Sequence, residues 1–147
     1  MDSMSEAGQS PIIEVVIASD TAEARRVQEE IEQLLKRHQY GERDIFGIRL
    51  ALEEALINAI KHGNQMDRAR KVHIAYRLEP GHFEVHVTDE GSGFDPCDVP
   101  DPCAPENLER PCGRGLMLMR HYMSEVRYND RGNAVVMSKL FRNGTKT

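Results

Sequence analysis

A chain of 147 residues is long enough for one domain built around a single hydrophobic core. Its content of 39% hydrophobic and 29% charged residues is ordinary for a folded globular protein. The formal net charge of −5 and the scarcity of aromatic residues argue against a nucleic-acid-binding surface, which needs basic charge and exposed rings.

The chain carries no targeting or membrane signal that we recognise. No stretch approaches the roughly 18 to 20 consecutive apolar residues that cross a bilayer. Residues 1–11 contain neither a basic residue nor an apolar run, so they do not resemble a secretory signal and are predicted to form a disordered lead. We therefore expect a cytoplasmic protein without membrane association, with a frayed tail at residues 142–147.

The first part of the chain is predicted to fold as one strand followed by two helices. The short β-branched run of residues 12–18 predicts a strand. Ser19 or Asp20 is expected to cap a helix, since Asp20 has Glu23 three residues later at a capping-box spacing, and this helix is expected to end near residues 38–41. Apolar residues at a helical period predict a second helix over residues 42–61.

The rest of the chain is predicted to contain two hairpins separated by a loop and a helix. Glycine and proline crowd residues 90–114, and a loop of that length in a small domain is usually a lid or a binding loop. The other predicted elements are strands at residues 72–78 and 83–88, a helix at 116–123, and strands at 125–128 and 134–141.

This element order predicts an α+β fold of one domain over residues 12–141. We expect a two-layer α/β sandwich, with a mixed, mainly antiparallel sheet and the helices on one of its faces.

All three cysteines, Cys97, Cys103 and Cys112, fall in the Pro-rich loop and its end. The odd count in a chain without a secretory signal argues against a disulfide framework. Their spacing contains no C-x-x-C pair, so free thiols on a loop are favoured over a structural zinc site, although the latter stays open.

The first group of residues with chemical potential lies on the second predicted helix. Glu54, Asn58 and His62 are spaced i, i+4 and i+8, so they form one polar stripe on an otherwise apolar helix. An amide oxygen can ligate a hard cation such as Mg²⁺, and a carboxylate can orient or deprotonate a nucleophile. The alternative is that the stripe simply faces solvent. Gly63 and Asn64 are expected to terminate this helix.

Two glycine-containing motifs follow at element ends. Asp89 ends a predicted strand and can accept a hydrogen bond from an exocyclic amine, while Gly91 and Gly93 allow the backbone to approach a ligand closely. Residues 113–116 (GRGL) open a predicted helix, where backbone N–H groups form a site for phosphate. Either motif alone is also compatible with an ordinary turn.

In this order, the three motifs resemble the N, G1 and G2 boxes of the GHKL (Bergerat-fold) ATPases. The runs LEEALINAIKHGN and GRGLMLMR are most similar to the bacterial anti-sigma-factor serine kinases. The resemblance extends from about Ile12 to Phe141. Cys112 departs from the pattern, because many relatives have glycine at that position.

The resemblance implies a role for each matching residue. Glu54 would be the general base, and Asn58 would coordinate Mg²⁺ at the phosphates of ATP. Asp89 would recognise the adenine amino group. The remaining residues implied to surround the nucleotide are Lys61, His62, Gly91, Gly93, Gly113, Arg114, Gly115 and Leu116.

The resemblance also implies a function and partners. It predicts an ATP- and Mg²⁺-dependent serine/threonine protein kinase that acts as an anti-sigma regulatory factor. Such a protein would phosphorylate an anti-anti-sigma protein of the STAS type, sequester an RNA polymerase sigma factor and form a homodimer. Two alternatives stay open: a non-catalytic ATP-binding switch, and the ATP-binding domain of a histidine kinase. The second is disfavoured because the chain has no dimerisation helix pair with a phosphoacceptor histidine.

Overall fold

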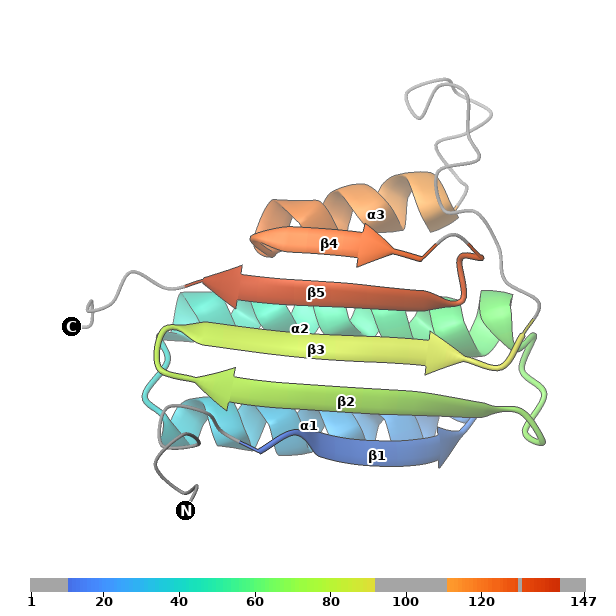
Figure 1. The fold of residues 1–147 in the computed structure, drawn as a ribbon, viewed down its shortest axis with the longest axis horizontal. Coiled ribbons are helices and arrows are strands. Elements are labelled where there is room, and N and C mark those ends of the chain that lie inside the picture. Colours follow the sequence, from blue (N-terminus) through green and yellow to red (C-terminus); the bar gives the residue numbers. More distant parts are fainter. Residues whose placement is uncertain (1–10, 92–110, 130, 141–147) are drawn as a thin grey trace, which may run out of the picture.

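The computed structural model of the chain describes residues 11–91, 111–129 and 131–140, with only the backbone for residues 111–114 (Figure 1). The described strands are β1 (Ile13–Ala18), β2 (Lys71–Glu79), β3 (His82–Asp89), β4 (Glu125–Tyr128) and β5 (Ala134–Leu140). The helices are α1 (Thr21–Arg37), α2 (Glu42–Ile57) and α3 (Pro111–Tyr122), and a π-helix, η1 (Asn58–Gly63), continues α2.

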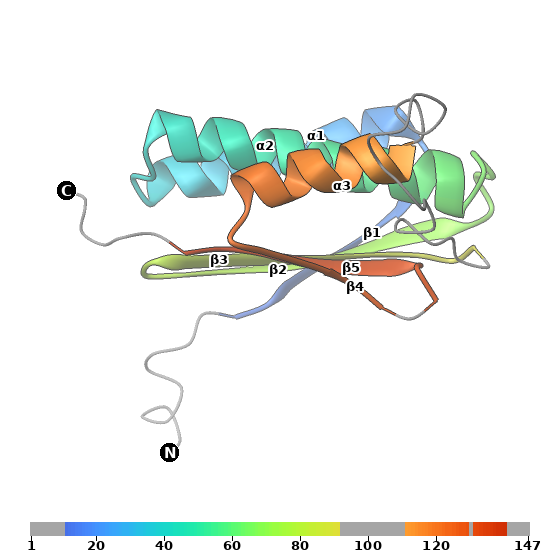
Figure 2. The ribbon, with the colours of Figure 1, turned by 90° about the horizontal axis from the view of Figure 1, so that it is seen from above.

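The strands form a single sheet in the order β1-β2-β3-β5-β4, and each of its four neighbouring pairs is antiparallel. The three α-helices lie in one layer on one face of this sheet, and the other face is open (Figure 2). The predicted α+β, two-layer architecture is confirmed. The final hairpin places β5 beside β3, so the turn after β4 lies close to the end of β3.

The core lies between the sheet and the helices. β2 alternates exposed and buried residues, as expected for a strand with one covered face, so Val72, Ile74 and Tyr76 are buried. Ile48 and Leu52 of α2 are almost fully buried against the sheet layer. Each such side chain stabilises the fold by roughly 1.5–3 kcal/mol relative to an exposed position.

The predicted start of α1 is confirmed, but the expected capping box is not formed. The Asp20 carboxylate accepts a hydrogen bond from the Ala22 backbone N–H at 2.7 Å and so caps the helix. In a capping box, Glu23 would bond back to the backbone N–H of the capping residue. Instead, Glu23 accepts from the Ala18 N–H at 2.9 Å, which joins the start of α1 to the end of β1.

The second predicted helix is present, but its last part is not α-helical. α2 ends at Ile57, and the chain continues to Gly63 as a π-helix. The bond from the Asn64 N–H to the Ala59 carbonyl, 2.8 Å long, shows this wider i→i−5 pattern. Gly63 and Asn64 do terminate the helical run, as predicted.

α3 begins at Pro111, five residues before the predicted Leu116 and inside the segment expected to form the loop. Proline is well suited to the first turn of a helix because its missing N–H has no intrahelical partner there. Phe141, the predicted last residue of the final strand, lies outside the described residues.

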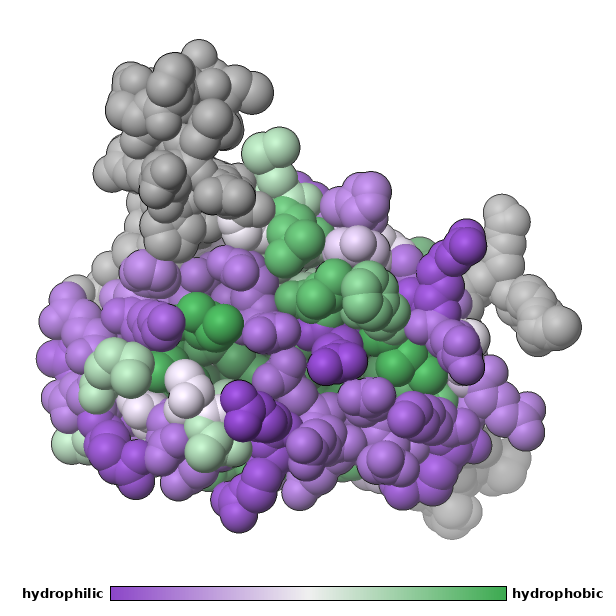
Figure 3. All heavy atoms as spheres, turned by 180° about the vertical axis from the view of Figure 1, so that it is seen from behind, coloured by the Kyte–Doolittle hydropathy of each residue, from purple (hydrophilic) through white to green (hydrophobic). Residues whose placement is uncertain are grey.

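On the helix side of the molecule, polar residues surround apolar patches (Figure 3). Phe46 of α2 and Met117 of α3 are the large apolar residues of these two helices that are more than half exposed, at 51% and 58%. No helix in the described ranges combines the length and the apolar character needed to cross a membrane.

Candidate functional site

Asn58 is the first residue of η1, and its side chain is buried although it is polar. Only 1% of the residue is exposed. Neither its amide oxygen nor its amide nitrogen has a hydrogen-bond partner within the described part of the chain. An unsatisfied buried amide costs roughly 1–3 kcal/mol, so the fold keeps this group at the expense of stability. A π-helical segment inside a longer helix is frequently found at a functional site.

Asp89, the last residue of β3, is also buried although it is charged, with 4% of its surface exposed. Burial raises the pKa of its carboxyl group above the ordinary value. The Gly91 backbone N–H, which donates to the carboxylate at 2.8 Å, acts in the opposite direction, and so do Arg131 and Arg70. The carboxylate is therefore held at the strand end, where the Gly91 N–H is its hydrogen-bond donor among the described residues.

Asn58 and Asp89 line the same narrow cavity between the helices and the sheet. Its apolar wall is formed mainly by small or β-branched side chains, namely Ala55, Ala59, Val87, Ala134 and Val135, and Tyr128 and Asn133 complete the lining. The cavity has about 10 Å³ of water-accessible space, so in this structure it is where these side chains meet and not an open ligand pocket. The fold thus brings Asn58 of the helix motif and Asp89 to one place.

The chain approaches itself very closely beside this cavity. A methyl group placed on Gly91 would overlap the carbonyl oxygen of Gly63, and one placed on Gly63 would overlap the carboxylate of Asp89. Both positions therefore require glycine because no side chain fits. The end of β3 with Gly91 and the end of η1 are therefore in close contact.

Glu54 lies one helical turn before Asn58, and its side chain lies against α3. A methyl group on Gly115 would overlap the Glu54 carboxylate, so the predicted GRGL motif and the predicted base are in direct proximity. Burial raises the pKa of Glu54, and the negative charge of Glu53 raises it further. A carboxylate with a raised pKa is better matched to general-base work near neutral pH.

The other predicted residues are placed less centrally. Lys61 and His62 are exposed residues of η1, and neither lines the cavity. Partial desolvation lowers the pKa of His62, and the neighbouring Lys61 lowers it further. Leu116 is 7% exposed and packs in the core, so only its backbone is available to a ligand.

Several predicted positions lie outside what the structure describes. Gly93 falls between the described ranges, as do Cys97 and Cys103. Gly113 and Arg114 belong to the first turn of α3, where only the backbone is described, and Cys112 lies in the same turn. Within the described residues, no group of three or more His, Cys, Asp or Glu side chains could hold a metal ion.

Sequence reasoning missed two asparagines that shape the site. Asn64, predicted only as a helix terminator, is fully buried and joins three segments by hydrogen bonds. Asn133 lies in the turn before β5. Its backbone carbonyl accepts a bond from the Asp89 N–H at 2.8 Å, and its side-chain amide donates to the Asp89 carbonyl at 3.3 Å. Because asparagine is common in turns, its presence alone did not distinguish either residue.

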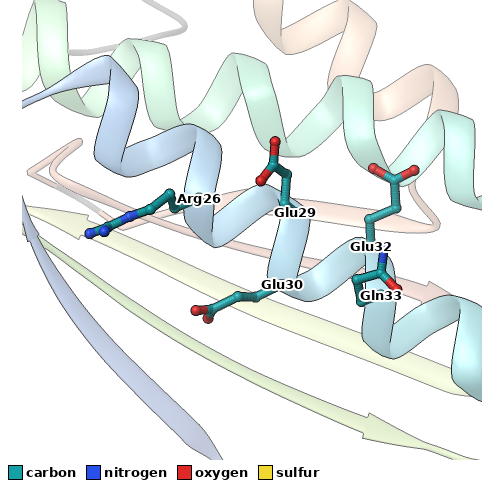
Figure 4. A pocket seen from close by; sticks show the side chains of 5 residues that line it. All are labelled: Arg26, Glu29, Glu30, Glu32 and Gln33. Carbon is teal, nitrogen blue, oxygen red and sulfur yellow. The ribbon is translucent and has the colours of Figure 1, made fainter.

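A second, shallow hollow lies along α1 and is a poor candidate for an anionic ligand (Figure 4). It is lined by Arg26, Glu29, Glu30, Glu32 and Gln33. Three carboxylates against one guanidinium would repel a polyphosphate.

Comparison with known proteins assigns the chain to a family. Residues 17–139 match the model of the histidine kinase-like ATPase domain, so the chain belongs to that family. Membership of an ATPase-domain family implies ATP as the nucleotide.

Curated relatives point to one class of enzyme within this family. The chain is 32% identical to the serine-protein kinase RsbW of Bacillus licheniformis over 108 residues, which cover 69% of this chain and 68% of the relative. It is 29% identical to the serine/threonine-protein kinase BtrW of Bordetella bronchiseptica over 103 residues, covering 69% and 72% of the two chains.

A solved structure supports the fold. The crystal structure of the RsbU and RsbW domains of a Mycobacterium tuberculosis protein aligns with a TM-score of 0.62 and 20% identity. The alignment covers 90% of this chain and 32% of that longer chain.

Replacing Asn58 by Leu is expected to stabilise the ligand-free protein. The change removes an unsatisfied amide from a buried position, so the free energy of unfolding should rise by about 1–3 kcal/mol. Urea unfolding of the ligand-free protein measures this. Asn64→Leu is the matched control, because that amide is hydrogen-bonded and its loss should lower stability. A fall in stability for both variants would contradict the assignment of Asn58 as an unsatisfied group.

Proposed function

We propose that this protein is an ATP- and Mg²⁺-dependent serine/threonine protein kinase that acts as an anti-sigma regulatory factor. The observation that supports this most is the buried, unpartnered amide of Asn58 in the same cavity as the Asp89 carboxylate. Glu54 lies one helical turn away and against Gly115. Asp89 would contact the nucleotide base, Asn58 the cation and Glu54 the attacking hydroxyl.

Asp89 would bind the adenine base. Its carboxylate can accept a hydrogen bond from the 6-amino group while the apolar wall of Ala55, Ala59 and Val87 contacts the ring. Gly63 and Gly91 would keep the backbone close enough for this contact, since neither leaves room for a side chain.

The residues present also suit Mg²⁺. An amide oxygen is a hard ligand of the kind that Mg²⁺ accepts, and Asn58 has such an oxygen without another partner among the described residues. When bound, the ion would neutralise charge on the phosphates during transfer. One amide is enough on the protein side, because Mg²⁺ in such sites keeps waters and phosphate oxygens as its other ligands.

Glu54 would act as the general base. Its carboxylate would accept the proton of an attacking serine or threonine hydroxyl, and its raised pKa favours this transfer. The backbone N–H groups at the start of α3, around Gly113 to Leu116, would bind the phosphates. Lys61 and His62 would add donors at the edge of the site. Positioning by these groups supplies most of the catalysis in phosphoryl transfer.

The proposed partners rest on the resemblance, and the names of the relatives support the kinase activity alone. The relatives from Bacillus licheniformis and Bacillus subtilis are named serine-protein kinases, which supports a serine acceptor. We propose that the acceptor is a STAS-type anti-anti-sigma protein and that the second partner is an RNA polymerase sigma factor. A cytoplasmic homodimer is part of the same proposal.

Glu54→Gln and Asp89→Asn are expected to fail in different ways. Glu54→Gln should retain ATP binding but slow phosphoryl transfer by about 10²–10⁴-fold, because the base is lost while the shape is kept. Asp89→Asn should lose ATP affinity. The new amide oxygen can still accept a bond from the Gly91 N–H, but the side chain no longer has a second oxygen that accepts from the adenine amino group. Calorimetric titration with ATP and transfer of label from γ-labelled ATP to a STAS acceptor measure the two effects.

Equal transfer rates for Glu54→Gln and the unmodified protein would contradict the kinase mechanism. ATP binding without transfer to any partner would instead support the non-catalytic switch.

Glu53→Gln is expected to move the acid limb of the pH–rate profile to lower pH. Transfer requires ionised Glu54, so kcat falls as the pH drops through the raised pKa of that residue. Removing the neighbouring charge of Glu53 lowers that pKa and extends activity to more acidic conditions. Glu29→Gln on α1 is the charge-matched control and should leave the limb in place. If the acid limb of the pH–rate profile is unchanged in Glu53→Gln, the ionisation of Glu54 does not determine that limb.

A further inference from the structure

Asn64 joins the three strand ends that surround the candidate site. Its amide nitrogen donates to the Ser19 hydroxyl at 2.9 Å, just after β1, and to the Lys71 carbonyl at 3.0 Å, at the start of β2. Its amide oxygen accepts from the Glu90 backbone N–H at 2.8 Å, just after β3. The side chain is 0% exposed, and its donors and acceptor are all used.

The contact with Glu90 bears directly on the base-binding carboxylate. Asp89 and Gly91, on either side of Glu90, form the turn in which the Gly91 N–H orients the Asp89 carboxylate. The bond from the Glu90 N–H to Asn64 therefore fixes the direction in which this turn leaves β3. Nothing else in the described residues accepts from that N–H.

The backbone around Asn64 is held in an uncommon conformation. Gln65 and Met66, which follow it, both have positive φ values, 54° and 62°, although neither is glycine. Non-glycine residues persist in this region only where surrounding contacts determine the conformation. A turn of this kind after η1 places the Asn64 side chain between the strands instead of toward solvent.

We propose that Asn64 is a positioning residue for base recognition, acting through the Glu90 N–H on the carboxylate of Asp89. This inference rests on the proposed function, in which Asp89 accepts a hydrogen bond from the adenine amino group. It predicts that Asn64, which lines no part of the cavity itself, determines how well ATP is distinguished from a nucleotide without that amino group.

Inosine triphosphate carries a carbonyl oxygen in place of the 6-amino group, so position 6 presents an acceptor to the Asp89 carboxylate instead of a donor. A hydrogen bond to a charged group corresponds to a preference of about 10–100-fold, which we expect for ATP over inosine triphosphate in the unmodified chain. Calorimetric titration of the full chain with each nucleotide, with Mg²⁺ present, measures this ratio. The ratio reports base recognition and is insensitive to a general loss of affinity.

Asn64→Ala should reduce the ratio by about tenfold. Ser19→Ala is the matched control, because it removes one partner of the Asn64 amide nitrogen but leaves the bond to Glu90. Both variants are expected to lose thermal stability, whereas only Asn64→Ala should lose discrimination. An unchanged ratio in Asn64→Ala would overturn the inference, and so would an equal loss in Ser19→Ala.

A second pair of variants provides the same test if Asn64→Ala does not fold. Glu90→Pro removes the backbone N–H that donates to the Asn64 amide oxygen. Glu90→Ala keeps this N–H and removes only the side-chain bonds to Lys71 and His73. Loss of discrimination in Glu90→Pro alone supports the inference, and retention of it in Glu90→Pro overturns it.

A failure of the proposed function gives a different result from a failure of the inference about Asn64. Lack of ATP binding by the unmodified chain, or binding without preference over inosine triphosphate, would overturn base recognition by Asp89 itself.

Discussion

The burial of two polar side chains, Asn58 and Asp89, in one cavity is the constraint on which the rest of the site depends. Each is disfavoured there: the Asn58 amide lacks a partner among the described residues, and desolvation raises the pKa of Asp89. A protein keeps such groups only where the remaining fold is stable enough to tolerate them, and functional sites are where this is expected. The dense core between α2 and the sheet provides that stability here.

Close backbone packing then determines the shape of the site. Gly63 and Gly91 touch without room for a side chain, and Asn64 binds the same two segments through hydrogen bonds. The third component, Gly115 of α3, leaves space for the Glu54 carboxylate. The groups proposed to bind the base, to bind the cation and to accept the proton thus come from different elements, which are held by direct contacts between them.

Much of this arrangement could be predicted from the sequence, because it follows from local patterns. Alternation in residues 72–78 identified β2, the helical period identified α1 and the whole of α2, and Asp89 was placed correctly at a strand end. The π-helix was not predictable in this way. The apolar period predicted one helix as far as residue 61, whereas the chain takes the wider turn from Asn58 onward. The roles of Asn64 and Asn133 depend on contacts with residues distant in sequence, for which a single sequence carries no signal.

A crystal structure with a non-hydrolysable ATP analogue and Mn²⁺ in place of Mg²⁺ tests the central claim most directly, because the anomalous signal locates the metal. The account predicts a metal ion within about 2.0–2.2 Å of the Asn58 amide oxygen or bound through the phosphates beside it. It also predicts the 6-amino group of the base at hydrogen-bond distance from the Asp89 carboxylate. A nucleotide bound elsewhere, or a metal remote from Asn58, would contradict it.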